Sequence, residues 1–433
     1  MLPRTQYLNK LIQKKDNGRV KIITGLRRSG KSVLLFELYK GYLLESGVSS
    51  SQIIELSLDV LANAKYRNPI ELDKYIREQI TDTGNQYYVL IDEIQFVSVI
   101  QNPYCDDPNA KITFVDVVLG LMQMKNVDVY VTGSNSRMLS TDILTQFRDR
   151  GDEIRVYPLS FGEFHAAFEG DKRSAWQEYY TYGGMPVILS LESHEEKSRY
   201  LRDLFNRTYL KDVIERNRIS NHTEVLSNLL DILASGIGSL TNPYKISNTF
   251  LTEEHLSIAP DTIDRYLGYF MNAFLIHKAN RYDVKGRKYI GSPLKYYFED
   301  VGLRNARLDF RQVEETHLME NILYNELRMR GYNVDVGAVS QRYIDKNSGS
   351  KLTRHLEIDF VANLGSRRYY IQSAFQLPDA EKVKQEKASL LAMKDSFKKI
   401  IIVKDVIKPF QDNDGILTIG LFDFLQNDNS LEW

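Results

Sequence analysis

The most constraining feature of the sequence is a glycine-rich stretch at residues 25–32, which reads Gly-Leu-Arg-Arg-Ser-Gly-Lys-Ser. It follows a β-branched run, Val20–Thr24, that predicts a buried parallel strand, and residues 33–42 after it predict a helix. Strand, G-x-x-x-x-G-K-S and helix in this order are typical of a phosphate-binding loop. The glycines let backbone N–H groups approach phosphate oxygens, and the helix N-terminus adds partial positive charge. The sequence therefore predicts a nucleotide site in an α/β domain with a parallel sheet.

The residues of this loop have different expected roles. Lys31 is expected to reach the β- and γ-phosphates, and Ser32 is expected to ligate Mg²⁺. Arg27 and Arg28 could approach phosphate or a neighbouring subunit, although simple exposure to solvent is an equal alternative. The full set of expected nucleotide contacts is Gly25, Arg27, Arg28, Ser29, Gly30, Lys31, Ser32 and Val33.

A phosphate-binding loop requires an acidic strand end downstream, and residues 87–93 read Tyr-Tyr-Val-Leu-Ile-Asp-Glu. We expect Asp92 to hold Mg²⁺ through water and Glu93 to act as the general base on the attacking water. An Asp-Glu pair also ends many ordinary strands, so the assignment depends on its pairing with the loop.

Two further residues are candidates for catalysis. The predicted strand 127–132 is followed by Gly-Ser-Asn-Ser, where Asn135 is expected to orient the water and Ser134 is the next choice. Helix capping is the alternative role for this turn. Arg150 precedes the predicted strand 154–156 and could stabilise phosphate charge, often across a subunit interface. A plain surface arginine is the alternative there.

Composition excludes several classes of protein. The chain has 56 Lys+Arg and 57 Asp+Glu, so no overall positive field draws it to nucleic acid or membrane, and any such contact requires a local patch. Its uncharged stretches are shorter than the ~18–20 apolar residues that span a bilayer, so no membrane contact is expected. Cys105 is the lone cysteine. These features predict a cytoplasmic protein.

Several motifs together resemble the AAA-type ATPase family of bacteria and archaea whose members carry a C-terminal domain of unknown function. The resemblance implies ATP as ligand with Mg²⁺, and it implies no settled substrate. In one departure, Asp149-Arg150 stands where the family usually has Gly-Arg. The motifs are residues 25–32, Arg4-x-x-Tyr7-Leu8, Ile91-Asp92-Glu93-Ile94-Gln95, Thr132-Gly133-Ser134-Asn135-Ser136, Pro158-Leu159-Ser160-Phe161-x-Glu163-Phe164 and Tyr182-Gly183-Gly184-Met185-Pro186.

The middle of the chain predicts helices followed by a β-hairpin near residues 275–290, which is the order of a winged helix. Asp261 and Asp264 open the third helix and argue against ordinary DNA readout by it. Residues 278–311 hold nine Lys/Arg and four Asp/Glu, a local excess that could bind a DNA backbone or a protein partner. The alternative is a solvated surface, or one that contacts another subunit.

The last part of the chain resembles the PD-(D/E)XK restriction-endonuclease fold. Glu320 matches the helix acid and Asp359 the strand acid of that fold, but Gln372 and Ala374 replace its second acid and its lysine. Metal-dependent nuclease activity is therefore disfavoured. The fold would instead bind nucleic acid or hold subunits together.

These observations predict three parts: an AAA-type parallel-sheet core at 1–168, a helical and winged-helix region at 169–310, and an α/β endonuclease-like domain at 311–433. The first functional hypothesis is Mg²⁺-dependent ATP hydrolysis coupled to motion between domains, compatible with a homo-oligomer in which Arg150 acts on a neighbour. The second is a nucleotide-gated DNA- or protein-binding module with slow or no turnover.

Overall fold

The computed structural model describes residues 2–133, 147, 150–219, 223–344 and 350–433. The chain forms two compact units. The N-terminal unit comprises Met1–Pro158 with Asn272–Phe274, and the C-terminal unit comprises Leu159–Met271 with Leu275–Trp433. Each unit has its own sheet, and the two are described separately below.

The N-terminal unit contains a five-stranded parallel sheet in the order β2-β3-β6-β1-β7. All residues of β1, β3 and β6 are buried, which explains their nearly continuous apolar sequences. Because the strands are parallel, their carboxyl ends meet at one edge of the sheet. The strands are β1 (Val20–Thr24), β2 (Ile53–Ser57), β3 (Tyr87–Asp92), β6 (Val127–Gly133) and β7 (Gly151–Arg155).

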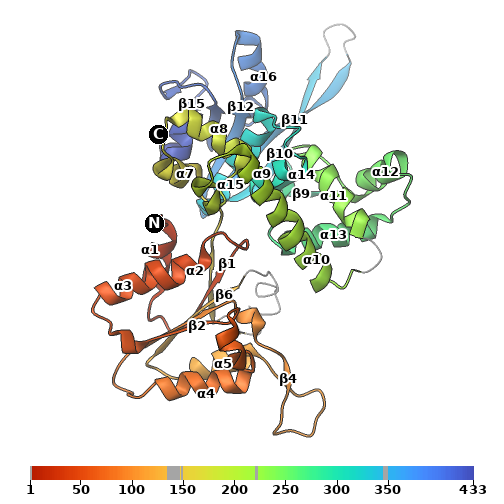
Figure 1. Ribbon diagram of the computed structural model, residues 1–433. Coiled ribbons are helices and arrows are strands. Elements are labelled where there is room, and N and C mark those ends of the chain that lie inside the picture. The colour runs from red at the N-terminus through yellow and green to blue at the C-terminus, as the bar shows by residue number, and fades with distance from the viewer. Residues whose placement is uncertain (1, 134–146, 148–149, 220–222, 345–349) are drawn as a thin grey trace. The chain divides into compact units, whose positions relative to one another are not determined.

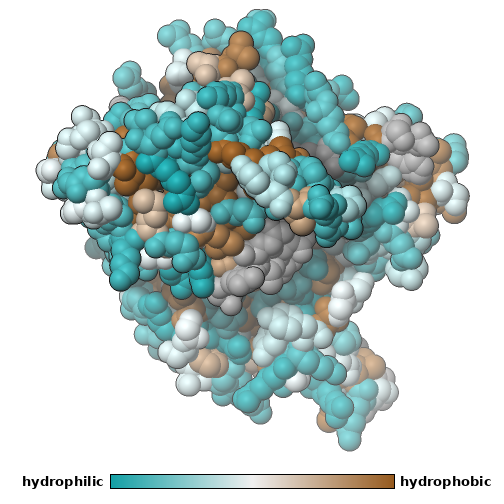
Figure 2. All heavy atoms as spheres, turned by 90° about the horizontal axis from the view of Figure 1, so that it is seen from below, coloured by the Kyte–Doolittle hydropathy of each residue, from teal (hydrophilic) through white to brown (hydrophobic). Residues whose placement is uncertain are grey.

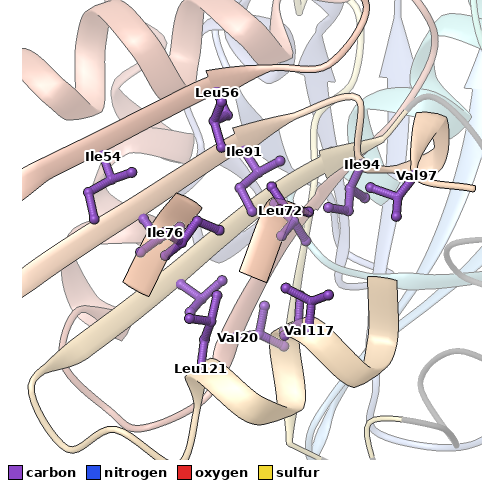
Figure 3. Packing of buried hydrophobic residues seen from close by; sticks show 14 of the residues in the cluster. Val20, Ile54, Leu56, Leu72, Ile76, Ile91, Ile94, Val97, Val117 and Leu121 are labelled. Atoms are coloured by element: carbon purple, nitrogen blue, oxygen red, sulfur yellow. The ribbon is translucent and has the colours of Figure 1, made fainter. Parts of the chain in front are cut away.

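Helices cover both faces of this sheet. On one face, Leu72 and Ile76 of α4 (Pro69–Gln79) and Leu121 of α5 (Phe114–Leu121) pack against apolar side chains of the strands (Figure 3). The Asn68 side chain caps α4, and Thr113 and Asp116 form a capping box on α5.

The opposite face is covered by α1 (Thr5–Lys14) and a helix that runs without a break from Lys31 to Glu45. Tyr39 of this helix stacks on Tyr130 of β6, with ring centres 4.6 Å apart. The long helix consists of α2 (Lys31–Val33), the π-helical η1 (Leu34–Tyr39) and α3 (Lys40–Glu45). The shorter elements of this unit are η2 (Ser50–Gln52), η3 (Leu61–Arg67), η4 (Ile94–Phe96), β4 (Ile100–Gln101) and β5 (Lys111–Ile112).

The C-terminal unit begins with helices and continues into a hairpin. Three helices and a hairpin follow one another from residue 223 to residue 298, which is the winged-helix order expected from the sequence. The elements are α7 (Phe161–Ala167), α8 (Lys172–Tyr182), η6 (Pro186–Ser190), α9 (His194–Asp203), the π-helical η7 (Leu204–Leu210), α10 (Lys211–Arg216), α11 (Thr223–Ser235), α12 (Pro243–Glu253), α13 (Pro260–Asn272), β8 (Ile276–Asp283) and β9 (Lys288–Phe298).

The rest of this unit completes an eight-stranded mixed sheet in the order β14-β15-β13-β12-β11-β10-β8-β9. Tyr324 of α15 stacks on Tyr297 of β9, with ring centres 4.2 Å apart, and so holds that helix on the sheet. The remaining elements are α14 (Val301–Arg307), α15 (Glu315–Met329), β10 (Asn333–Ile344), β11 (Lys351–Leu364), β12 (Arg367–Ala374), α16 (Ala380–Leu391), β13 (Lys398–Val403), β14 (Phe410–Gln411), β15 (Ile416–Gly420), α17 (Leu421–Gln426) and η8 (Ser430–Glu432).

The structure draws the domain boundaries differently from the sequence. The expected boundary at residue 168 lies ten residues too late, since the first unit ends at Pro158. The expected boundary at residue 310 does not separate two units. Strand β8 of the middle region pairs in parallel with β10, so the predicted hairpin and the last strands form one continuous sheet.

The surface provides no sign of a membrane span in the described parts of the chain. No helix there is both long and apolar enough to cross a bilayer. On the face shown in Figure 2, hydrophilic residues cover most of the surface and hydrophobic ones lie in scattered patches.

Candidate functional site

The loop that follows β1 requires glycine at two positions for different reasons. Gly25 has φ +137°, and a Cβ there would lie 2.0 Å from the carbonyl oxygen of Val156. Gly30 has φ +97° but has open space around the position of its missing Cβ. Gly25 therefore combines close packing against the chain after β7 with a conformation that glycine favours, whereas Gly30 supplies the conformation alone.

Lys31 is a buried cation at the start of the helix. It is 4% exposed, and its Nζ donates hydrogen bonds to the carbonyl oxygens of Gly25 at 3.2 Å and Leu26 at 2.8 Å. Burial lowers the pKa of Lys31 to about 8, against the opposing influence of Glu93 and Asp92. The ammonium thus contacts neutral carbonyls of the loop itself, and a bound anion would stabilise its charge.

A chain of hydrogen bonds joins the loop to the acidic strand end. Ser32 Oγ donates to Asp92 Oδ2 at 2.8 Å, and the Thr132 hydroxyl donates to Asp92 Oδ1. The N–H of Glu93 donates to Thr132 Oγ1 at 3.1 Å. Thr132 can make both contacts because β6 lies between β1 and β3 in the sheet.

Sequence reasoning did not identify Thr132 as a site residue. The sequence analysis assigned a role to the turn after the strand, whereas Thr132, the last polar residue of the strand itself, lies beside Asp92. Asp92 is 4% exposed and Thr132 is fully buried. Thr132 could have been found from its sequence pattern, because it is a polar residue at the end of a strand that lies next to the strand ending in Asp92.

Glu93 lies in a left-handed turn directly after β3, with φ +55°. Its side chain is half-buried, and its Oε2 accepts a hydrogen bond from Gln95 Nε2. Gln95 is the second contact that sequence reasoning missed. The amide fixes one oxygen of the carboxylate that we expect to act as the base.

The remaining predicted loop residues differ in exposure. Arg28 and Val33 are exposed, and Arg27 is half-buried. Ser29 is buried, and its hydroxyl donates to the carbonyl oxygen of Val156 at 3.4 Å. The Ser29 side chain thus anchors the loop, which leaves its backbone for any contact with phosphate.

These donors fit a magnesium nucleotide. The hydroxyl of Ser32 and the carboxylate of Asp92 are hard oxygen ligands of the kind that Mg²⁺ prefers. The buried Lys31 and the N-terminal N–H groups of the helix suit the phosphates. The predicted residues Gly25, Gly30, Lys31, Ser32, Asp92 and Glu93 belong to this one edge of the sheet.

Arg150 lies at the opposite edge of the sheet. Its carbonyl oxygen accepts the N–H of Val20, the first residue of β1, and its side chain is exposed. Five residues of β1 separate it from the loop, roughly 16 Å of extended chain. Arg150 is therefore remote from the loop of its own chain, and both alternatives given by the sequence stay open: action on a neighbouring chain, or a plain surface arginine.

Arg155 is the arginine of β7 that lies at the loop edge. It is paired in register with Thr24, and its guanidinium is centred 4.8 Å from the ring of Tyr157. Asn135 and its alternative, Ser134, lie outside the described residues.

In the C-terminal unit, the two acids matched to the nuclease fold are brought together with an unexpected lysine. Lys295 Nζ of β9 lies 2.9 Å from Glu320 Oε1 and 2.8 Å from Glu357 Oε1. Burial would lower the pKa of Lys295, but the neighbouring carboxylates outweigh it and raise that pKa. Burial, with the charge of Glu320, raises the pKa of Asp359 to about 8.

This cluster does not restore a metal centre. Among the described residues, no group of three or more His, Cys, Asp and Glu side chains is arranged to hold a metal ion. Gln372 Oε1 accepts a hydrogen bond from Ser389 at 3.4 Å, and Ala374 is buried in an apolar cluster. The ammonium of Lys295 provides the positive charge among the carboxylates.

The cationic excess counted over residues 278–311 does not form one exposed patch. Lys295 is buried, and Arg304 is 2% exposed and bonded to the carbonyl oxygen of Ala234. Arg307 Nη2 donates to Asp231 Oδ2 at 2.6 Å. The expectation of a DNA-binding surface over this whole stretch is therefore not supported, because much of its charge is used inside the fold.

Comparisons with known proteins agree with this site. An AAA domain family matches residues 17–165, and a domain of unknown function matches residues 173–314. An uncharacterised protein of Haemophilus influenzae is 35% identical over 430 residues, which cover 98% of both chains.

A second uncharacterised protein, from Methanocaldococcus jannaschii, is 28% identical over 393 residues, 87% of this chain and 79% of that protein. Among solved structures, the Walker-type ATPase of Pyrococcus abyssi is similar with a TM-score of 0.47 and 14% identity. That match covers 71% of this chain and 96% of the other. The phosphate-binding loop, the acidic strand end and the near full-length relative together show that the chain belongs to the AAA-type P-loop ATPase family, in which the AAA domain precedes a domain of unknown function.

Proposed function

We propose that this protein hydrolyses ATP in the presence of Mg²⁺ at the loop edge of the N-terminal sheet. The observation that carries the proposal is the hydrogen-bonded series Ser32–Asp92–Thr132 beside the buried ammonium of Lys31. Together these groups provide oxygen ligands for a cation and a positive charge for phosphate in one small region.

Each residue has a defined task in this reaction. Lys31 and the N–H groups of the loop bind and orient the triphosphate, and Ser32 and Asp92 hold Mg²⁺. The ion, when bound, offsets phosphate charge. Glu93 accepts a proton from the water that attacks the γ-phosphorus, and the bond to the β,γ-bridging oxygen breaks to give ADP and phosphate.

Two catalytic assignments extend this proposal beyond the loop edge. Asn135, which follows β6 in the sequence, orients the attacking water. Arg150 stabilises phosphate charge in a neighbouring copy of the chain, which requires a homo-oligomer. Mixing Arg150→Ala chains with Glu93→Gln chains tests the second assignment, because trans action predicts partial recovery of activity in mixed assemblies. An absence of recovery, with assembly verified, would remove the role of Arg150.

The central test uses Lys31→Ala and Glu93→Gln. Lys31→Ala should abolish both nucleotide binding and turnover, whereas Glu93→Gln should bind Mg·ATP and fail to hydrolyse it. Lys74→Ala is the matched control, because Lys74 is an exposed lysine on α4 with a side chain 67% exposed. Hydrolysis at the wild-type rate by either site variant would refute the mechanism.

A second candidate function is a nucleotide switch with slow turnover. The hydrogen bond from Gln95 to Glu93 favours it, because the amide occupies one oxygen of the carboxylate that would otherwise be open to the attacking water. If Gln95 restrains the base, Gln95→Ala should raise the steady-state rate several-fold. A fall in rate would indicate that Gln95 positions Glu93 for catalysis.

We also propose that turnover moves the two units relative to each other. Cys105 is exposed and is the sole cysteine, so it can carry one dye in the N-terminal unit. A second dye on Lys394→Cys would label the C-terminal unit. The efficiency of energy transfer between the dyes is then compared without nucleotide, with ATP in the Glu93→Gln background and with ADP. Identical efficiencies in the three states would contradict coupled motion.

A further inference from the structure

The outer halves of β10 and β11 form a two-stranded ribbon that has no neighbour in the sheet. β8 pairs with β10 only at Val336, Gly337 and Ala338, and β12 pairs with β11 only from Phe360 onward. Beyond these points the two strands pair only with each other (Figure 1). Every described residue in 340–344 and 350–355 is exposed.

An exposed ribbon of this kind is unusual for a strand pair that serves only the fold. Isolated two-stranded hairpins are marginally stable in water, and exposed strand edges invite pairing with other chains. Tyr343 is 45% exposed, Ile344 63% and Leu352 43%. The ribbon therefore presents apolar side chains to solvent without burying them against its own chain.

The described residues of the ribbon, 340–344 and 350–355, carry a net positive charge. Arg342, Lys351 and Arg354 are exposed, and none of them forms an ion pair within the described parts of the chain. The residues 340–344 and 350–355 include no Asp or Glu. His355 is exposed beside Ser340, with 3.3 Å between its Nδ1 and the serine Oγ.

The register distributes these cations over both faces. Arg342 pairs with Thr353 and Ile344 with Lys351, which places Arg342 and Lys351 on one face. Arg354 pairs with Gln341 and so lies on the other face, together with Tyr343 and Leu352. An element with cations on both faces suits a partner that surrounds it with negative charge.

A second basic element lies at the base of the ribbon. Lys285 and Arg287 lie in the turn between β8 and β9, Lys288 begins β9, and all three residues are exposed. Lys285 Nζ donates to the carbonyl oxygen of Ser340 at 3.0 Å, which fixes this turn beside the first exposed residue of the ribbon. The two hairpins therefore form one continuous basic surface within the C-terminal unit.

We propose that the β10–β11 ribbon enters the major groove of duplex DNA and that its cations, with those of the β8–β9 turn, contact the phosphodiester backbones. The major groove of B-DNA is about 12 Å wide and admits a two-stranded β-ribbon. The deep, narrow major groove of duplex RNA does not admit one, so duplex DNA is the partner that this shape favours. Tyr343 and Leu352 can contact base edges and thymine methyl groups from the same face as Arg354.

The test is the salt dependence of DNA binding by the full-length protein. Arg342→Gln/Lys351→Gln/Arg354→Gln removes three ribbon cations. The matched control, Lys384→Gln/Lys394→Gln/Lys408→Gln, removes three cations that are also exposed and lie in the same unit. Fluorescence anisotropy with a dye-labelled duplex of about 30 base pairs measures affinity from ~50 to ~200 mM salt.

Loss of three phosphate contacts should reduce the slope of log K against log salt by about 2.7. The wild-type protein should thus lose about forty-fold more affinity than the ribbon variant over that salt range, and the control should behave as wild type. Unchanged binding by the ribbon variant would overturn the proposal. So would an absence of binding by wild type at ~50 mM salt, or equal affinity for duplex RNA of the same length. ATP hydrolysis and circular dichroism of the ribbon variant verify that it folds.

Discussion

Thr132→Val is the most informative single substitution for the architecture of the nucleotide site. Valine has nearly the shape of threonine but lacks the hydroxyl that donates to Asp92 and accepts the N–H of Glu93. The first of these hydrogen bonds involves a carboxylate and contributes about 1.5–3 kcal/mol, and leaving a buried N–H unpaired costs about 1–3 kcal/mol. Because Glu93 is half-buried, we expect the lower part of the combined range, about 3 kcal/mol of stability.

The assay must report on the N-terminal unit alone. Both tryptophans, Trp176 and Trp433, belong to the C-terminal unit, so their fluorescence reports on that unit. Differential scanning calorimetry with and without Mg·ATP solves this, since bound nucleotide raises the transition of the unit that binds it. Thr132→Val should lower that transition and reduce kcat/KM by about tenfold or more.

Thr132→Ser separates the hydroxyl from the packing. Serine keeps both hydrogen bonds and loses one methyl group, worth about 1 kcal/mol, so its turnover should stay near wild type. If Thr132→Val matched wild type in both the nucleotide-shifted transition and kcat/KM, the bridging role would be wrong. The same conclusion would follow if Thr132→Ser were as impaired as Thr132→Val.

Three further predictions concern other residues of the two units. Because burial lowers the pKa of free Lys31 to about 8 and bound phosphate would raise it, ATP affinity should be constant below that pH and fall up to about tenfold per pH unit above it. Proton uptake on binding, measured by calorimetry in two buffers, should appear above pH 8, and its absence would contradict the assignment. Gly25→Ala should destabilise the N-terminal unit by more than about 3 kcal/mol, because its Cβ would lie 2.0 Å from the Val156 carbonyl oxygen. Gly30→Ala, where only φ is strained, should cost about 1 kcal/mol of stability. If thermal unfolding showed equal losses of stability for Gly25→Ala and Gly30→Ala, this distinction between the two glycines would be wrong. Lys295→Met should cost about 3 kcal/mol near neutral pH, by leaving Glu320 and nearby carboxylates without their cation. Urea titration measures that loss, and a free energy of unfolding equal to that of the wild type would argue against the charge-based explanation.

The raised pKa of Asp359 makes the stability of the C-terminal unit depend on pH in the wild-type protein. Burial raises the folded-state pKa of Asp359 to about 8, which is higher than the ordinary carboxyl value. The folded state therefore holds the proton more tightly than the unfolded chain does. Stability from this group is fully present at low pH and is lost as the pH rises towards 8. Asp359→Asn should flatten this part of the stability curve.

The nucleotide site could be predicted from the sequence because its chemistry is contiguous. The Gly25–Ser32 stretch is a single turn whose backbone conformation is encoded by its glycines, and the acidic pair Asp92-Glu93 ends an apolar run. Parallel strands bring such ends to one edge whatever their order. The order of helices and hairpin in the middle region was also readable, since each element carries its own pattern of apolar residues.

The sequence pattern could not predict side-chain contacts that depend on the order and register of the strands. Thr132 contacts Asp92 because β6 lies between β1 and β3, and Lys295 stands among carboxylates because β9 lies over α15. Counting charges over residues 278–311 failed for the same reason: Arg304 and Arg307 point into the fold, whereas Arg342 and Arg354, farther along the chain, are exposed. Local conformation follows from neighbours in sequence, but the environment of a charge depends on which distant strands and helices pack around it.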